Sequence, residues 1–90
     1  MTVAECFAAN LLRIRKEADL SQEQLSTMAS IHRTEVSMLE RGIRIPRIDT
    51  LVKLACSLEV SAGALLAGID WKPGAPVLGR FKVSDEGGSL

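Results

Sequence analysis

The sequence SQEQLSTMASIHRTEVSMLERG, residues 21–42, contains two short segments with helical spacing, separated by a break at Ser30-Ile31. Ser21 is followed three residues later by Gln24, which is the pattern of a capping box. In such a box the two side chains satisfy backbone N–H groups that have no partner inside the helix. The pattern predicts that a short helix begins directly after Ser21.

A second helix is predicted over residues 32–40. His32 and Glu35 repeat the capping-box spacing in weaker form, because histidine is a poor N-cap residue. Gly42 follows the segment and can take a positive φ, which is how many helices end. Pro46 prevents an immediate helical restart in the loop that follows.

Small and apolar residues occupy the positions where these two helices must touch. Two short helices meet at a fixed angle only if particular small and apolar residues close the contact between them. Counted from Gln22, the fourth, fifth, eighth, tenth, fifteenth and eighteenth positions carry Leu25, Ser26, Ala29, Ile31, Val36 and Leu39. This spacing is typical of a helix-turn-helix, and Met28 is expected to be buried with its neighbours.

Three further helices are expected around this unit. An apolar stripe over residues 3–18 predicts a helix before it, and Asp49 or Thr50 can cap a helix after it. Ser61 can cap a fifth, short helix that ends at Gly68. The stripes comprise Phe7, Leu11, Ile14 and Ala18 in the first of these helices and Leu51, Leu54, Ala55 and Leu58 in the second. The sequence therefore predicts an all-α, five-helix domain over residues 1–70.

Residues 71–90 differ in composition and are expected to form a C-terminal extension. Val77 to Val83 alternate roughly with period two, which favours one β-strand, and residues 84–90 are expected to be disordered. A lone strand leaves its backbone groups without partners. The strand therefore pairs with its symmetry mate in a dimer, packs on its own helices, or is disordered, and the first alternative is favoured.

The composition limits the function of the chain. Ninety residues with 47% hydrophobic and 24% charged side chains suit one globular domain. A formal charge of zero argues against a non-specific basic coat on nucleic acid. No apolar run approaches the roughly 20 residues that span a bilayer, and Met1 to Glu5 lack the basic segment of a secretion signal. A cytoplasmic protein is expected.

Enzymatic activity, cofactors and metal ions are not expected. The chain has one histidine, no tyrosine, no phosphate-binding glycine loop and no acidic pair placed on one apolar face. His32 has no second ligand at metal spacing. Cys6 and Cys56 lie far apart among apolar neighbours, so both are expected to be small buried hydrophobic residues and not a disulfide.

The sequence resembles the phage repressor/Cro-like (XRE) helix-turn-helix family from about Phe7 to Gly68. The resemblance rests on Leu12, Ile14 and Arg15, on Leu20-Ser21-Gln22-Glu23-x-Leu25, on His32-Arg33-Thr34-x-Val36-Ser37-x-Leu39-Glu40-Arg41-Gly42, on Pro46, and on the spaced residues Leu51, Leu54, Ala55, Leu58, Val60, Ser61, Leu65 and Leu66. One position departs from the family. The ninth residue of the unit, usually glycine, is Ser30, so the turn either strains this serine or is built differently.

The resemblance implies a DNA-binding, lambda-repressor-like fold with residues 32–40 in the major groove. Arg33, Thr34 and Met38 are then the expected base readers, and the Arg33 guanidinium suits guanine O6 and N7. Contacts to phosphate are expected from Gln22, His32, Ser37, Arg41, Arg44 and Arg47.

Several of these assignments keep an alternative. A surface arginine is usually only solvated, and both interpretations stay open for Arg44 and Arg47. Arg33 needs a reason to be in the first helical turn, where it opposes the helix dipole. Glu35 is expected to cap the helix and not to read cytosine, and His32 either caps the helix or touches phosphate.

The family pattern also implies a structural ion pair between Arg15 and Glu40, which fixes the recognition helix from behind. A single module offers little surface to DNA, so a homodimer on a palindromic site is expected. The rival hypothesis is a protein-interaction module or antitoxin with the same fold. The near-zero charge favours that rival slightly, and the arginines around the recognition helix count against it.

Overall fold

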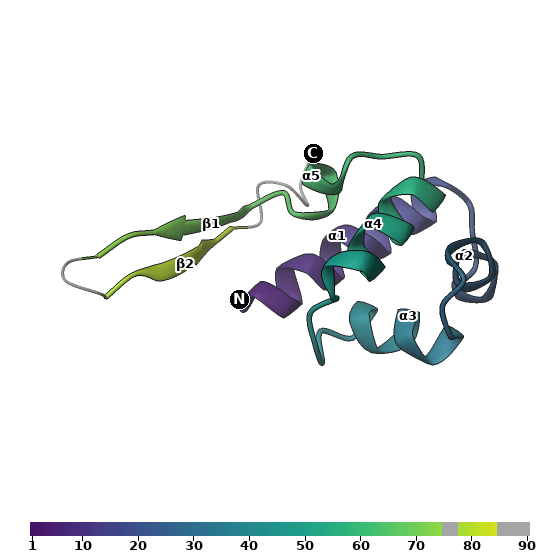
Figure 1. Ribbon diagram of the computed structural model, residues 1–90, viewed down its shortest axis with the longest axis horizontal. Helices are drawn as coiled ribbons and strands as arrows, with labels where there is room; N and C mark the ends of the chain where they lie inside the picture. The colour runs from purple at the N-terminus through teal and green to yellow at the C-terminus, as the bar shows by residue number, and fades with distance from the viewer. Residues whose placement is uncertain (75–77, 85–90) are drawn as a thin grey trace.

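The computed structural model describes residues 1–74 and 78–84, which form five helices and a two-stranded hairpin (Figure 1). The elements are α1 (Val3–Glu17), α2 (Gln22–Ala29), α3 (Arg33–Glu40), α4 (Ile48–Ser57), α5 (Ala62–Leu65), β1 (Ile69–Lys72) and β2 (Arg80–Val83). The expected five-helix domain is confirmed. The first helix ends one residue earlier than expected, so Ala18 is its exposed C-cap and not part of the buried stripe.

Local capping sets where α2, α3 and α5 begin. The Ser21 hydroxyl accepts from the Gln24 N–H at 3.0 Å and the Gln24 side chain accepts from the Ser21 N–H at 2.8 Å, which confirms the capping box. His32 caps α3, because its Nδ1 accepts from the Thr34 N–H at 3.1 Å. The Ser61 hydroxyl accepts from the Ala64 N–H at 3.1 Å, so this predicted cap is also confirmed.

Two other cap predictions were wrong. Helix α4 begins at Ile48 with Arg47 at the N-cap and no side-chain cap hydrogen bond, so neither Asp49 nor Thr50 is the cap. Glu35 does not complete a capping box on α3, because its carboxylate faces Arg44 instead. Helix α5 ends at Leu65, three residues before Gly68.

All five helices contribute to one core, in which α1 packs on α3 and α5 and α2 packs on α3 and α4. Buried Ser26 lies at 5% exposure in α2, which confirms the small residue expected where α3 approaches. Gly42 has a φ of +70°, as predicted for the end of α3. The buried apolar cluster consists of Phe7, Leu11, Ile14, Leu25, Ala29, Val36, Leu39, Leu54, Ala55, Leu58 and Leu65.

Two residues expected inside are on the surface. Met28 is 54% exposed, although it belongs to the same short helix as buried Leu25 and Ala29. Cys56 is an exposed free thiol on α4, whereas Cys6 is buried, as expected. In both cases one helix face covers the core, and these side chains lie just beyond its edge.

The turn between α2 and α3 places Ser30 in the left-handed region, with φ 55° and ψ 43°. The Ile31 N–H donates to the Ser26 carbonyl at 3.0 Å across this turn. A left-handed conformation brings the Cβ of an L-residue too close to the following carbonyl, which is the reason glycine is favoured there. The turn is therefore built on a strained serine.

Ser30→Gly should raise stability, because it removes this Cβ without disturbing the turn. We expect a gain of roughly 1 kcal/mol, which corresponds to a melting temperature about 4–8 °C higher for a domain of this size. Thermal unfolding followed by circular dichroism measures it. Ser30→Ala is the matched control, since it retains Cβ and should melt no higher than the parent. Equal melting temperatures for the glycine and alanine variants would contradict the strain.

The C-terminal strand pairs within its own chain. Strand β2 is antiparallel to β1, with Trp71 opposite Phe81 in the register. The favoured expectation, a strand from Val77 to Val83 paired across a dimer, was therefore wrong. The strand begins at Arg80, and Val77 lies outside the described residues, as do residues 85–90. The expected division at residue 70 falls inside β1 and stays a prediction.

Hydrogen bonds from Asn10 of α1 and from Ser84 hold residues 65–68, the segment that leads into the hairpin. Asn10 is 1% exposed, and its Nδ2 donates to the Leu65 and Ala67 carbonyls at 2.9 and 2.8 Å. The Ser84 N–H donates to the Gly68 carbonyl at 2.9 Å, where Gly68 has a φ of +85°. The rest of the hairpin projects away from the helices (Figure 1).

Candidate nucleic-acid interface

A buried ion pair holds α3 from behind. Arg15 of α1 meets Glu40 of α3 with Nε 2.5 Å from Oε2 and Nη2 3.0 Å from Oε1. The two side chains are only 11% and 4% exposed. Arg15 Nη1 also donates to the Leu20 carbonyl at 2.7 Å, and the hydrogen bond with Glu40 raises the pKa of Arg15 against the opposing effect of burial. The structure thus brings together the pair that the family pattern implied.

Gln22 adds a second link to this pair. Its Nε2 donates to Glu40 Oε1 at 2.9 Å, so the start of α2 is connected to the end of α3 through one carboxylate. The contact with phosphate expected from Gln22 stays a prediction, and the side-chain nitrogen is already engaged. The backbone N–H groups of Gln22 and Glu23 remain for an anion, because the Gln24 N–H already donates to the Ser21 hydroxyl.

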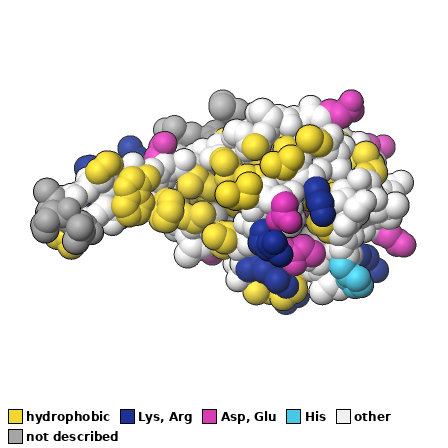
Figure 2. Space-filling view, in the orientation of Figure 1, with side chains coloured by type: hydrophobic (Ala, Val, Ile, Leu, Met, Phe, Trp, Pro, Cys, Tyr) yellow, Lys and Arg dark blue, Asp and Glu magenta, His cyan; other side chains and the backbone are white. Residues whose placement is uncertain are grey.

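A shallow hollow joins the N-terminal ends of α2 and α3. Its volume is about 280 Å³, and His32 is one of the residues that line it. His32 is the single histidine of the chain, and Figure 2 shows it beside Lys and Arg side chains. A ridge of phosphates fits a concavity lined by polar side chains and helix N-termini. The lining residues are Gln22, His32, Arg33, Thr34 and Ser37, all of which the resemblance assigned to DNA.

Arg33 and Thr34 lie exposed on the first turn of α3. Among the described residues, Arg33 has no ion-pair or hydrogen-bond partner for its guanidinium. A cation at this end of a helix also opposes the helix dipole. The Arg33 guanidinium therefore forms no ion pair or hydrogen bond within the described part of the protein. It is available to a hydrogen-bond acceptor on another molecule.

Met38 and Arg44 form a cluster that the sequence did not predict. Arg44 donates from Nη2 to the Met38 sulfur at 2.7 Å, and the same nitrogen lies 3.4 Å from Glu35 Oε1. Met38 is thus half-buried, with its sulfur covered on the side of the loop. No local spacing signals this contact, because Arg44 reaches back over the end of α3 from a loop.

The other two loop arginines are on the surface. Arg47 is 86% exposed, and its Nε lies 3.5 Å from Asp49 Oδ1, an ion pair of little energetic weight in solvent. Arg41 is the exposed C-cap of α3. Together with Arg44 these cations flank the C-terminal end of α3, on the opposite end from Arg33.

Comparison with known proteins identifies the family. The sequence model of a family described as "Helix-turn-helix" matches residues 11–65, which is more than half of the chain. The chain belongs to this helix-turn-helix family. The matched region begins in α1 and ends with α5, so it contains the ion pair behind α3 and the hollow in front of it.

Two relatives support the same assignment. Control protein C.SmaI of Serratia marcescens is 38% identical over 66 residues, which are 73% of this chain and 79% of that protein. An uncharacterized HTH-type transcriptional regulator of Sinorhizobium fredii, y4dJ, is 34% identical over 73 residues, or 81% of this chain and 95% of its own.

Solved structures agree. The restriction-modification controller protein C.AhdI from Aeromonas hydrophila superposes with a TM-score of 0.67 at 31% identity, over 69% of this chain and 94% of that one. A hypothetical transcription factor from Neisseria has a TM-score of 0.69 at 31% identity, over 72% of this chain and 75% of its own.

The helix-turn-helix protein described here is thus a DNA-binding transcriptional regulator of the XRE type, and the family is not a class of enzymes. Among its described residues, no helix is both long and apolar enough to cross a bilayer.

Proposed function

We propose that this chain binds a palindromic DNA operator as a homodimer in the cytoplasm, with α3 in the major groove, and so regulates transcription. The observation that supports it most is the exposed guanidinium of Arg33, without a partner among the described residues, on a helix that the Arg15–Glu40 pair fixes from behind. A side chain that reads bases must be exposed to reach them, and the helix that carries it must be held in a fixed position.

Within this proposal the base readers are Arg33, Thr34 and Met38. Arg33 forms two parallel hydrogen bonds with guanine O6 and N7, and Thr34 supplies a hydroxyl and a methyl group. Met38 offers only apolar contact, and the Arg44 guanidinium must leave its sulfur before a thymine methyl can approach on that side. The phosphate contacts come from the hollow between α2 and α3 and from Arg41, Arg44 and Arg47.

Two-fold symmetry follows from the area of a single module. One such module offers about 600–1,000 Å² to DNA, which is too little for tight specific binding. A homodimer doubles this contact and places two copies of α3 about one helical turn apart on the same face of the duplex. The operator should therefore be palindromic.

In vitro selection from a random duplex pool tests the proposal. The expected result is one enriched motif with two inverted half-sites whose centres are separated by about 10 bp. A pool with no enriched motif, together with gel shifts that vanish in competitor DNA, would overturn the proposal and favour the rival protein-interaction module.

Arg41→Ala should weaken specific and non-specific DNA binding to similar degrees, because a phosphate carries no sequence information. The slope of log affinity against log salt should become shallower by roughly one unit for each phosphate that the variant no longer neutralises. Binding titrations at several salt concentrations measure this slope. Glu59→Ala, an exposed change on the α4–α5 turn, is the control and should leave the slope unchanged. A larger drop in affinity on the matched operator than on scrambled DNA would assign Arg41 to the bases instead.

A further inference from the structure

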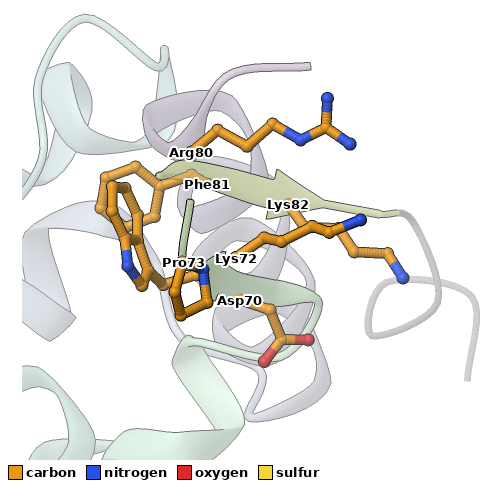
Figure 3. Close-up of a pocket in the computed structure, with 7 residues that line it drawn as sticks. Asp70, Lys72, Pro73, Arg80, Phe81 and Lys82 are labelled. Atoms are coloured by element: carbon orange, nitrogen blue, oxygen red, sulfur yellow. The ribbon is translucent and has the colours of Figure 1, made fainter. Parts of the chain in front are cut away.

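The hairpin has one aromatic face and one charged face, on which Asp70 lies opposite Lys82. Paired residues in an antiparallel register lie on the same face, and successive residues alternate between faces. Trp71 is opposite Phe81, and their rings meet edge to face with centroids 5.1 Å apart. Figure 3 shows the Phe81 ring on one side of the hairpin, whereas the labelled Lys72, Arg80 and Lys82 extend on the other.

The aromatic face is built but left uncovered. Trp71 packs so closely on Gly79 that a Cβ added there would lie 2.0 Å from the indole ring. Even so, Trp71 and Phe81 are 54% and 59% exposed, and an open hollow of about 650 Å³ lies along the hairpin. A two-stranded hairpin with no third layer is marginally stable in water. This face therefore needs a covering surface.

Exposed hydrophobic side chains continue from the hairpin onto the body of the domain. Figure 2 shows them following one another from the hairpin toward the helices. The exposed large hydrophobic side chains on α4, at the end of α5 and on the two strands, which we call the apolar band, are Ile48, Val52, Leu66, Trp71 and Phe81. Ile48 is 80% exposed and Val52 is 50% exposed. Large exposed apolar surfaces mark interaction sites.

We propose that the apolar band is the homodimer interface, in which the aromatic face of each hairpin packs on the α4–α5 surface of a second copy. This proposal deepens the function proposed above, since it names the surface that creates the two-fold symmetry. The contact is isologous, because each copy contributes a projecting hairpin and a receiving surface. A two-fold rotation is then sufficient to cover both parts of the band.

The area of the band favours packing on the body over packing between two hairpins. The exposed parts of the two rings amount to roughly 200 Å² in all, since an aromatic side chain buries about 150–250 Å² when fully covered. A stable interface buries about 800 Å² on each partner. Two hairpins alone fall well short of this, and Ile48, Val52 and Leu66 add further exposed apolar area when the hairpin packs on the α4–α5 surface.

Charge favours a second copy as the occupant and a face-to-face contact as the geometry. The chain has a formal charge of zero, so two copies approach without net repulsion. Lys72, Arg80 and Lys82 stand along the strands, and charged side chains on short edge strands discourage edge-to-edge pairing. The aromatic face is the part of the hairpin without such protection.

The single tryptophan allows a direct test with the full chain. Trp71 is the only tryptophan and the chain has no tyrosine, so intrinsic fluorescence reports the hairpin alone. On dilution from micromolar to nanomolar protein, we expect the emission maximum to shift to longer wavelength. The shift should coincide with the fall in sedimentation mass from twice 9.7 kDa to 9.7 kDa. A mass change without an emission change would place the interface elsewhere and overturn the proposal.

Phe81→Ser should weaken the dimer at least tenfold, because each interface loses two central aromatic anchors. Lys82→Ser is the matched control, since it alters the next residue on the opposite face and should leave the dimer dissociation constant unchanged. A Phe81→Ser protein that dimerises as tightly as the parent would overturn the proposal.

Val52→Glu tests the receiving surface without touching the hairpin. It should also weaken the dimer at least tenfold, because a carboxylate would be buried against the rings. Thr27→Glu, at an exposed position of α2 outside the band, is its control. A Val52→Glu protein with the parent's dissociation constant would contradict the proposed surface. A parent that forms a dimer which none of these variants weakens would overturn only this inference, whereas failure of the selection experiment would overturn the proposed function.

Discussion

Arg15→Ala should destabilise the domain by about 3–5 kcal/mol, the usual cost of removing one partner from a buried ion pair. Glu40 is 4% exposed and would keep only the Gln22 amide as a hydrogen-bond donor. The Leu20 carbonyl would lose its guanidinium donor as well. Domains of this kind are stable by about 5–15 kcal/mol in total, so the variant should lose a large share of its stability and melt well below the parent.

Urea unfolding measures this cost, and α1 supplies a matched control. Arg13 and Glu17 also form an ion pair, with 3.3 Å between Nη1 and Oε1, but Glu17 is 60% exposed. Glu17→Ala should therefore cost less than about 0.5 kcal/mol. Below its unfolding temperature, Arg15→Ala should keep the base preference of the parent. An Arg15→Ala protein as stable as Glu17→Ala would show that the pair contributes little.

The helical core could be predicted from the sequence because its signals are local. The apolar spacing around Leu25, Val36 and Leu39 predicts which faces are buried, and the structure buries all three. Caps at Ser21 and Ser61 depend on residues three positions apart, so they too can be found without the fold. Helix propensity and burial agree at these positions.

The hairpin could not be predicted correctly because its strands are short and its pairing is not local. Strand β1 has four residues, and nothing in Ile69–Lys72 indicates that they pair with residues about 8–14 positions away. The sequence pattern predicted only the second strand of the hairpin and no partner for it in the same chain. Pairing with a second copy was therefore the favoured expectation. The exposed positions of Met28 and Cys56 were missed for a related reason, since periodicity does not define where a buried face ends.

The candidate site was only partly predictable. The exposed residues at the start of α3 follow from the position of the helix, and the structure places Arg33 and Thr34 there. The contacts of Glu35 and Met38 with Arg44 depend on the path of a loop, for which the sequence has no periodic signal. In the proposed mode of recognition, these contacts would change what Met38 presents to DNA.

Arg33→Ala should reduce affinity for the preferred operator by roughly 1–3 kcal/mol for each half-site and relax the preference at one base pair in each. The effect follows from the loss of two hydrogen bonds with guanine, which a phosphate contact would not provide. The fold should be unaffected, because the side chain is exposed and has no partner among the described residues.

The ratio of matched to scrambled affinity is the quantity that tests the central claim most directly. It is measured by titrating the parent, Arg33→Ala and Arg41→Ala on the selected operator and on a scrambled duplex of equal length at fixed salt. We expect Arg33→Ala to lower this ratio by roughly 5-fold to 150-fold for each half-site and Arg41→Ala to leave it nearly unchanged. An unchanged ratio for Arg33→Ala would mean that α3 does not read bases through this residue, which contradicts the proposed mode of recognition.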